Sequence, residues 1–245
     1  MIPTPFMGRL RRYRTAWSRH HRSGGFGIHS PFAFYFVQRV LGEKCPYYAY
    51  AHIELLRIRL KDQAGRRWRG QHIISLKMAK MLFRIANYFN PARMLIIGER
   101  HAVATASVMA VSSKSRVVLH APEWEADELL RTTLQPHEGR IHVSSDLSEC
   151  LKAYSSQISP QEKPFVLIHE LCDEMELEAV KSAIFPIIER QGVVIMRNLH
   201  NSTLMASLWE QCMAHAQHGQ TYTNEKSGII VANPKLQREH FFLWF

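Results

Sequence analysis

The chain has 245 residues, of which 46% are hydrophobic and 21% are charged, an ordinary balance for a folded globular protein. This composition excludes disordered, collagen-like and coiled-coil proteins. No apolar run reaches the ~18 residues of a membrane-spanning helix, and the arginine-rich start lacks the apolar segment of a secretory signal. The 4 cysteines are far apart and form no Cys-x-x-Cys pair, which favours neither a disulfide framework nor a zinc site. We therefore expect a cytoplasmic protein.

The net charge of +10 is unevenly distributed along the chain. Residues 1–84 hold 17 basic and 3 acidic side chains, whereas residues 85–245 hold 14 and 18. A basic N-terminal part therefore precedes a slightly acidic remainder. Basic segments favour contacts with nucleic acid, anionic lipid or an acidic protein.

Residues 1–90 have helical patterns. Phe6, Leu10, Tyr13 and Trp17 fall on one helical face, among 6 arginines in residues 9–22. This stretch has three interpretations: peripheral contact of residues 6–22 with an anionic membrane, contact with nucleic acid phosphates, or an apolar stripe that packs on the domain with solvated arginines. The third is favoured, membrane contact comes second, and the absence of a base-reading motif makes nucleic acid the weakest.

Later signals in this region predict further helices. Ser23-Gly24-Gly25 would end the first helix, Pro31 can open the next, and Met78, Leu82, Ile85 and Phe89 would line one face of another.

From residue 92 onward, short apolar runs alternate with helical segments. The runs are β-branched and apolar throughout, as buried parallel strands are. They are Arg93–Gly98, Arg116–His120, Arg140–Ser144, Phe165–His169 and Gly192–Arg197. The helical segments between and after them are Trp124–Leu134, Met175–Glu189 and Ser202–His215. This alternation predicts a doubly wound, mostly parallel α/β sheet, closed by a hairpin over Gln220–Val231 and a further strand over Glu239–Phe245.

The first predicted strand leads into a turn and a helix of small residues, MLIIGERHAVATASVMA (Met94–Ala110). The turn resembles the acid-x-Gly-x-x-x-Gly motif of class I S-adenosylmethionine-dependent methyltransferases. The small residues of the following helix suit either close packing of helix on sheet, which we favour, or close approach of a ligand.

Motifs elsewhere resemble a small bacterial family of these enzymes. They are Gly27-Ile28-His29-Ser30-Pro31-Phe32, Tyr47-Tyr48, Ile53-Glu54, Leu82-Phe83-Arg84, Tyr88-Phe89-Asn90-Pro91 and the C-terminal GIIVANPKLQREHFFLWF. The resemblance spans residues 8 to 245. It implies a Rossmann-like sheet of seven strands in residues 91–245, a basic helical cap or lid in residues 1–90, and O-methyl transfer to a small molecule.

The resemblance also assigns site residues. Gly98, Ala102, His120 and Asp146 occupy the positions that contact S-adenosylmethionine, with Asp146 at the site that often meets the adenine amino group. His29, His169 and His200 are candidate catalytic residues near the acceptor. Catalysis in such enzymes is mostly positioning, with a base where needed.

The chain departs from the family at residues that carry the chemistry. Ile96 replaces the acid of the first motif and Ala102 its second glycine. His120 replaces the carboxylate that accepts both ribose hydroxyls, His169 an active-site aspartate, and Arg197-Asn198 an acidic pair. Losing about three hydrogen bonds to charged groups would weaken cofactor binding roughly 10³- to 10⁶-fold.

Two function classes therefore remain. The first is a methyltransferase with impaired or atypical cofactor binding. The second is a non-catalytic relative, a pseudoenzyme, that binds an anionic ligand, a membrane surface, or a protein partner such as a paralogue or a second copy.

One cluster bears on this choice, because the predicted ligand edge has changed from acidic to neutral or basic. Its members are Arg100, His101, His120, His169, Arg197 and His200. The cluster suits an anion, although drift in an abandoned pocket explains it more simply. His120, His169, Glu170 and Cys172 have no recognised metal-ligand spacing, so we expect no metal site.

Overall fold

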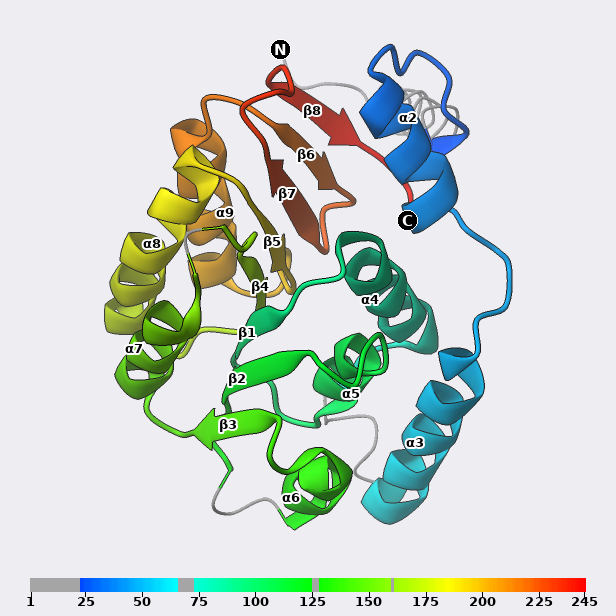
Figure 1. Ribbon diagram of the computed structural model, residues 1–245, viewed down its shortest axis with the longest axis vertical. Helices are drawn as coiled ribbons and strands as arrows, with labels where there is room; N and C mark the ends of the chain where they lie inside the picture. Colours follow the sequence, from blue (N-terminus) through cyan, green and yellow to red (C-terminus); the bar gives the residue numbers. More distant parts are fainter. Residues whose placement is uncertain (1–22, 66–72, 125–127, 160) are drawn as a thin grey trace, which may run out of the picture.

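The computed structural model describes residues 23–65, 73–124, 128–159 and 161–245, and its centre is an 8-stranded mixed sheet with helices on both faces (Figure 1). The strands are β1 (Arg93–Ile97), β2 (Arg116–His120), β3 (Ile141–Ser144), β4 (Phe165–Ile168), β5 (Gly192–Met196), β6 (Gln220–Thr223), β7 (Gly228–Ala232) and β8 (Glu239–Phe242). Their order across the sheet is β3-β2-β1-β4-β5-β7-β6-β8. The doubly wound α/β prediction is confirmed.

The first 5 strands are parallel, and β7 runs antiparallel to both β5 and β6. The predicted count of seven strands is too low by one. The strand predicted over Glu239–Phe245 is β8, which pairs with β6 in parallel register, Gln220 opposite Glu239. A tight hairpin cannot join two parallel neighbours, so after β7 the chain passes the start of β6 before β8 begins.

The described helical elements lie between these strands and before them. They are α2 (Pro31–Phe36), the π-helix η1 (Val37–Leu41), α3 (Ala49–Ala64), α4 (Leu76–Phe89), α5 (Val103–Met109), α6 (Glu128–Leu134), the 3-10 turn η3 (Gln135–His137), α7 (Leu147–Gln157), α8 (Glu174–Glu189) and α9 (Thr203–His215).

Helix starts follow local capping chemistry. Ser30, Ser75 and Ser202 accept backbone N–H bonds at the starts of α2, α4 and α9, and Asp173 does so at α8. Pro31 follows the first of these caps, as predicted.

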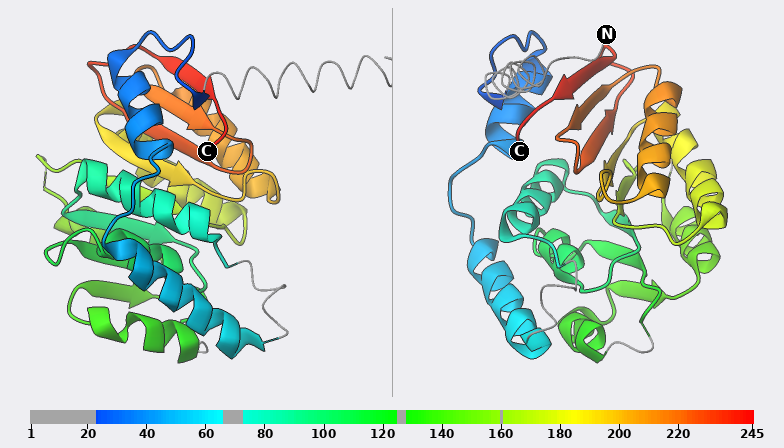
Figure 2. Two further views of the ribbon diagram at one scale, coloured as in Figure 1. Left: turned by 90° about the vertical axis from the view of Figure 1, so that its right-hand side faces the viewer. Right: turned by 180° about the vertical axis from the view of Figure 1, so that it is seen from behind.

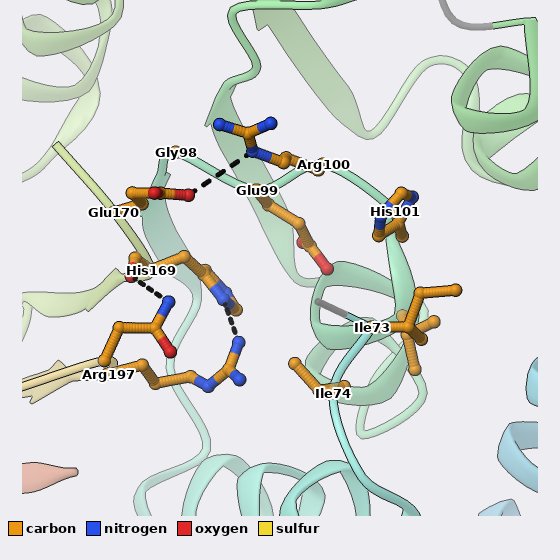
Figure 3. Close-up of a pocket in the computed structure, with 11 residues that line it drawn as sticks. Ile73, Ile74, Gly98, Glu99, Arg100, His101, His169, Glu170 and Arg197 are labelled. Atoms are coloured by element: carbon orange, nitrogen blue, oxygen red, sulfur yellow. Dashed lines mark hydrogen bonds and ion pairs between the residues drawn. The ribbon is translucent and has the colours of Figure 1, made fainter. Parts of the chain in front are cut away.

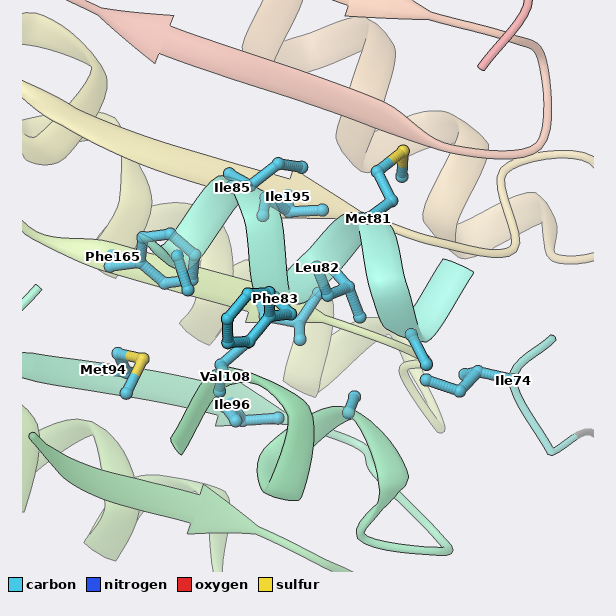
Figure 4. Close-up of a cluster of buried hydrophobic side chains, with 14 of the residues drawn as sticks. Ile74, Met81, Leu82, Phe83, Ile85, Met94, Ile96, Val108, Phe165 and Ile195 are labelled. Carbon is cyan, nitrogen blue, oxygen red and sulfur yellow. The ribbon is translucent and has the colours of Figure 1, made fainter. Parts of the chain in front are cut away.

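Two apolar layers sandwich the sheet, because alternate strand residues point to opposite faces. Met94 and Ile96 join the layer formed by α2 to α6, whereas Leu95 and Ile97 join the layer formed by α7, α8 and α9. Figure 4 shows the first layer, in which Phe83 and Leu82 of α4 lie against the sheet. Burial on both faces explains why the parallel strands are apolar without alternation.

The described part of the predicted cap packs directly on the sheet. Side chains of α2 and α4 belong to the same hydrophobic cluster as β1, β4, β5 and β7. Figure 2 shows α2 alongside β6 and β8, close to the end of the chain. The predicted basic helix over residues 6–22 lies outside the described residues, as does most of the linker after α3.

Within the described ranges, no helix combines the length and the apolar character needed to cross a bilayer.

Candidate functional site

The carboxyl ends of the parallel strands form the edge at which ligands bind in such sheets. The turn after β1 begins with Gly98, whose φ of +71° is in the region that favours glycine. A Cβ atom there would lie 2.1 Å from the backbone oxygen of Glu170, in the loop after β4. Gly98 is therefore required by the close approach of two loops of the chain itself.

The same turn buries a carboxylate that the sequence analysis did not single out. Glu99 is 4% exposed and accepts hydrogen bonds from the backbone N–H groups of Ala104 (2.6 Å) and Thr105 (2.9 Å), and from the Thr105 hydroxyl. Ala102, the N-cap of α5, has a φ of +55° and no side-chain cap. Glu99 supplies the missing acceptor, so the start of α5 is satisfied from within the chain.

Burial raises the pKa of Glu99, and its hydrogen bonds and the nearby Arg197 oppose that rise. The sequence signal for the role of Glu99 was an acidic residue shortly before the start of a helix. This signal was weak, because the sequence pattern does not distinguish a buried helix cap from an exposed one.

His169 and Arg197, at the ends of β4 and β5, contact one another (Figure 3). Arg197 Nη1 lies 2.6 Å from His169 Nδ1, and Asn198 Nδ2 donates to the backbone oxygen of His169 at 3.0 Å. Since the guanidinium can only donate, His169 Nδ1 is the acceptor and its hydrogen is on Nε2. The ends of β4 and β5 thus carry a guanidinium bonded to a neutral imidazole.

Burial and the adjacent guanidinium lower the pKa of His169 well below its ordinary value, so this ring is neutral. Burial also lowers the pKa of Arg197 to about 10, while Glu99 and Glu170 oppose that shift. Arg197 therefore remains charged at neutral pH, and the nearby Glu99 and Glu170 favour its charged form.

These residues leave little room between them. The cavity beside Gly98 has a volume of about 20 Å³, which is space for about one water molecule. Ile73 and Ile74, from the segment before α4, close it on the side opposite Arg197 (Figure 3).

Arg100 also belongs to this edge, but its charge is balanced locally. Its side chain lies 3.1 Å from Glu123 and 3.3 Å from Glu170. This part of the edge, which the sequence suggested to be neutral or basic, therefore combines a cation with nearby carboxylates.

His120 and Asp146 stand at the next two strand ends. His120 is buried at the end of β2, and burial lowers its pKa, against the influence of Glu176 and Asp146. Asp146 is exposed and caps α7 by accepting the N–H of Ser148 at 2.8 Å. Gly98, Ala102, His120 and Asp146 thus lie at or after the ends of β1, β2 and β3.

The three candidate catalytic histidines are not brought together. His169 lies in the cavity wall, whereas His200 is exposed in the turn after β5 and bonds Asn201. His29 is exposed and precedes Ser30, whose hydroxyl accepts from Gln220 at 2.7 Å. Gln220 begins β6, which runs in the same direction as β5, so His29 is at the opposite edge of the sheet.

Among the described residues, no group of three or more His, Cys, Asp or Glu side chains is arranged to hold a metal ion.

Comparisons with known proteins give the fold its family context. No family model matches the sequence, and no curated protein matches it. Solved structures do match. The O-methyltransferase from Bacillus cereus in complex with SAH is 15% identical with a TM-score of 0.54, over 79% of this chain and 96% of that one.

Two further neighbours agree. Cofactor-bound Rv0187 from MTB is 16% identical with a TM-score of 0.51, over 81% of this chain and 94% of that one. The O-methyltransferase TomG from Streptomyces achromogenes, in complex with SAM, is 12% identical with a TM-score of 0.52, over 81% and 95%. At these identities the likeness establishes the architecture: the chain has the Rossmann-like fold of the class I methyltransferases.

Proposed function

We propose that this chain is a methyltransferase-fold protein that does not hold S-adenosylmethionine at the ordinary position, and that it acts as a non-catalytic relative of methyltransferases acting on oxygen. The observation that carries the proposal is the contact between Arg197 and His169 beside Gly98, which leaves a cavity of about 20 Å³. Sites for small molecules typically measure ~300–1,000 Å³. The described side chains at this point therefore do not fit the cofactor.

Repulsion between positive charges also disfavours S-adenosylmethionine at this position. S-adenosylmethionine carries a positive sulfonium, and two unit charges about 4 Å apart repel by roughly 4 kcal/mol near a protein surface. Arg197 already places a cation among Glu99 and Glu170, which are the carboxylates that would otherwise favour a sulfonium.

The position expected to bind the ribose also disfavours the cofactor. His120 is buried, and burial lowers its pKa, so it is a neutral ring. A neutral imidazole offers one acceptor nitrogen, whereas a ribose diol presents two hydroxyl donors to a carboxylate. The exposed Asp146 is already engaged as a helix cap.

An anionic ligand at this edge, the alternative suggested by its basic residues, gains no support from the geometry. Arg100 pairs with Glu123 and Glu170, and Arg197 has Glu99 and Glu170 nearby. An incoming anion would meet these carboxylates before it met an unpaired cation.

Calorimetric titration of the folded protein with S-adenosylmethionine and S-adenosylhomocysteine tests the proposal. We expect no binding tighter than about 100 μM, or −5.5 kcal/mol, for either compound. Circular dichroism of the same sample establishes that the protein is folded. Binding tighter than this limit would contradict the proposal, and the Arg197→Ala variant would then show whether the bound compound contacts this edge.

A further inference from the structure

A larger cavity lies away from the strand ends, between α3 and α6. Its volume is about 360 Å³, within the ~300–1,000 Å³ typical of small-molecule sites. Figure 1 shows α3 and α6 at one end of the molecule, with α5 next to them towards its middle. None of the residues that close the cavity beside Gly98 lines this one.

The floor and lower walls of this α3–α6 cavity are apolar. Ala106 of α5, which is buried, contributes its methyl group to the floor. Leu56 and Leu60 of α3 and Pro136 of η3 complete the apolar part. Such a surface favours a hydrocarbon or aromatic body.

The rim of the cavity carries hydrogen-bond donors and a positive charge. Arg59 of α3 lines it, and none of the described residues forms an ion pair with this guanidinium. His137 faces it from the other wall, with Arg140 Nη2 2.9 Å from its Nδ1. Because the guanidinium donates to Nδ1, the His137 hydrogen is on Nε2, and the ring is a further donor backed by a cation.

The remaining charged and titratable groups of the lining are His52 and Asp62, both on α3. Asp62 is the only acidic residue among the described residues that line the cavity. It disfavours a carboxylate beside it, whereas Arg59 and His137 favour one. Among the lining residues, the charge of Arg59 is balanced by that of Asp62. Arg140, which does not line the cavity but contacts His137, adds a positive charge behind the wall that His137 forms.

We propose that the α3–α6 cavity is a binding site for a small amphipathic carboxylate, whose apolar body lies on Leu56, Leu60, Ala106 and Pro136 and whose carboxylate is held by Arg59 and His137. This site is independent of the strand-end edge, so it can exist whether or not the protein binds S-adenosylmethionine.

Three probes with one tail and different head groups test the proposal: octanoate, 1-octanol and octylamine, titrated calorimetrically into the whole protein at neutral pH. We expect octanoate to bind with a dissociation constant of roughly 0.1–1 mM. We expect the alcohol and the amine to bind at least about tenfold more weakly, since the alcohol offers Arg59 one neutral oxygen in place of a bidentate carboxylate and the protonated amine offers no acceptor.

Variants on α3 locate the site. Arg59→Gln should weaken octanoate binding about tenfold, whereas Lys61→Gln, on the same helix but outside the lining, should not. Gln63→Trp places an indole at the cavity and should abolish binding, whereas Leu55→Trp, exposed and off the lining, should leave it unchanged. Thermal unfolding of all four variants establishes that they fold.

Failure of octanoate to bind the native protein would overturn the proposal. So would equal affinity for the amine, which would show that the site does not select a carboxylate. Binding that survives both Arg59→Gln and Gln63→Trp would place the ligand elsewhere and overturn it as well.

Discussion

At the scale of single residues, Gly98 illustrates how a motif residue can be retained for a structural reason. Its φ of +71° and the 2.1 Å separation between an added Cβ and the Glu170 oxygen both require glycine. The family resemblance attributes this glycine to cofactor approach, whereas the described contacts attribute it to the loop after β4.

Gly98→Ala should therefore destabilise the protein by about 3 kcal/mol, the sum of left-handed backbone strain and a backbone clash. Gly139→Ala is the matched control, because Gly139 has a φ of +70° and nothing within 4 Å of an added Cβ. It should cost only the strain, about 1 kcal/mol. Denaturant unfolding measures both, and equal losses would refute the clash.

His169 makes the stability of the fold depend on pH. Burial and Arg197 lower its pKa in the folded state, so the unfolded chain takes up a proton first when the pH falls below about 6.5. His169 therefore contributes to the free energy of unfolding above about pH 6.5, and this contribution is lost progressively as the pH falls below that value.

The variant His169→Gln retains an acceptor for Arg197 but cannot titrate. Between pH 7.5 and 5.5 the native protein should lose about 1.4 kcal/mol more unfolding free energy than the variant does. His200→Gln, at the exposed turn after β5, should behave like the native protein. If His169→Gln lost as much stability as the native protein, buried neutral His169 would be ruled out as a source of the pH dependence.

At the scale of elements, the π-helix η1 depends on a side chain from a different helix. Arg84 of α4 is 8% exposed, and it donates to the backbone oxygens of Val40 (2.6 Å) and Leu41 (2.8 Å) and to the Tyr50 hydroxyl (3.0 Å). These two carbonyls belong to the last residues of η1, so no N–H group of a following helical turn donates to them. Arg84 thus fixes the end of η1 against α4.

Arg84→Met keeps much of the side-chain volume but removes all three donors. Two buried carbonyls would lose their partner, and we expect a loss of about 3 kcal/mol in unfolding free energy. Lys77→Met, at an exposed position of the same helix, should change stability by less than about 0.5 kcal/mol. A similar small effect for Arg84→Met would show that η1 ends without it.

The positions of the helices and strands were the features best predicted from the sequence. Each parallel strand was predicted to within a residue or two, because strands buried on both faces are continuous apolar runs. Ser202 and Pro31 marked helix starts correctly, since capping is local chemistry. The π-helix was not predictable, because its end is stabilised by Arg84, 43 residues from Leu41 in sequence.

The candidate site was less predictable, since it depends on side-chain direction. The replacement of acids by His169 and Arg197 was visible in the sequence, but their mutual contact was not. Likewise the basic residues were visible, whereas their pairing with Glu123 and Glu170 was not. His29 was a candidate catalytic residue but lies at the opposite edge of the sheet. A sequence motif gives the order of its residues, but it does not give the edge of the sheet on which each of them lies.

At the scale of the whole molecule, the early and late parts of the chain are interdependent. The ring of Phe36, the last residue of α2, is tilted against that of Tyr222 of β6, with ring centroids 4.9 Å apart. The Gln220 side chain donates to the Ser30 hydroxyl at 2.7 Å. The backbone N–H of Trp244 donates to the Ser23 hydroxyl at 2.7 Å. The first described residues therefore complete a layer with the last strands.

This closure sets an order of events during synthesis. At ~5–20 residues per second, about 10 to 40 seconds separate the emergence of residue 41 from that of residue 245. During that interval α2 has no β6 or β8 to cover, and its aromatic side chains stay exposed to other chains. Although α2 is synthesised early, it can pack in its final position only after β6 and β8 have been made. Its exposure to other chains in the cell would therefore depend on how quickly these strands follow.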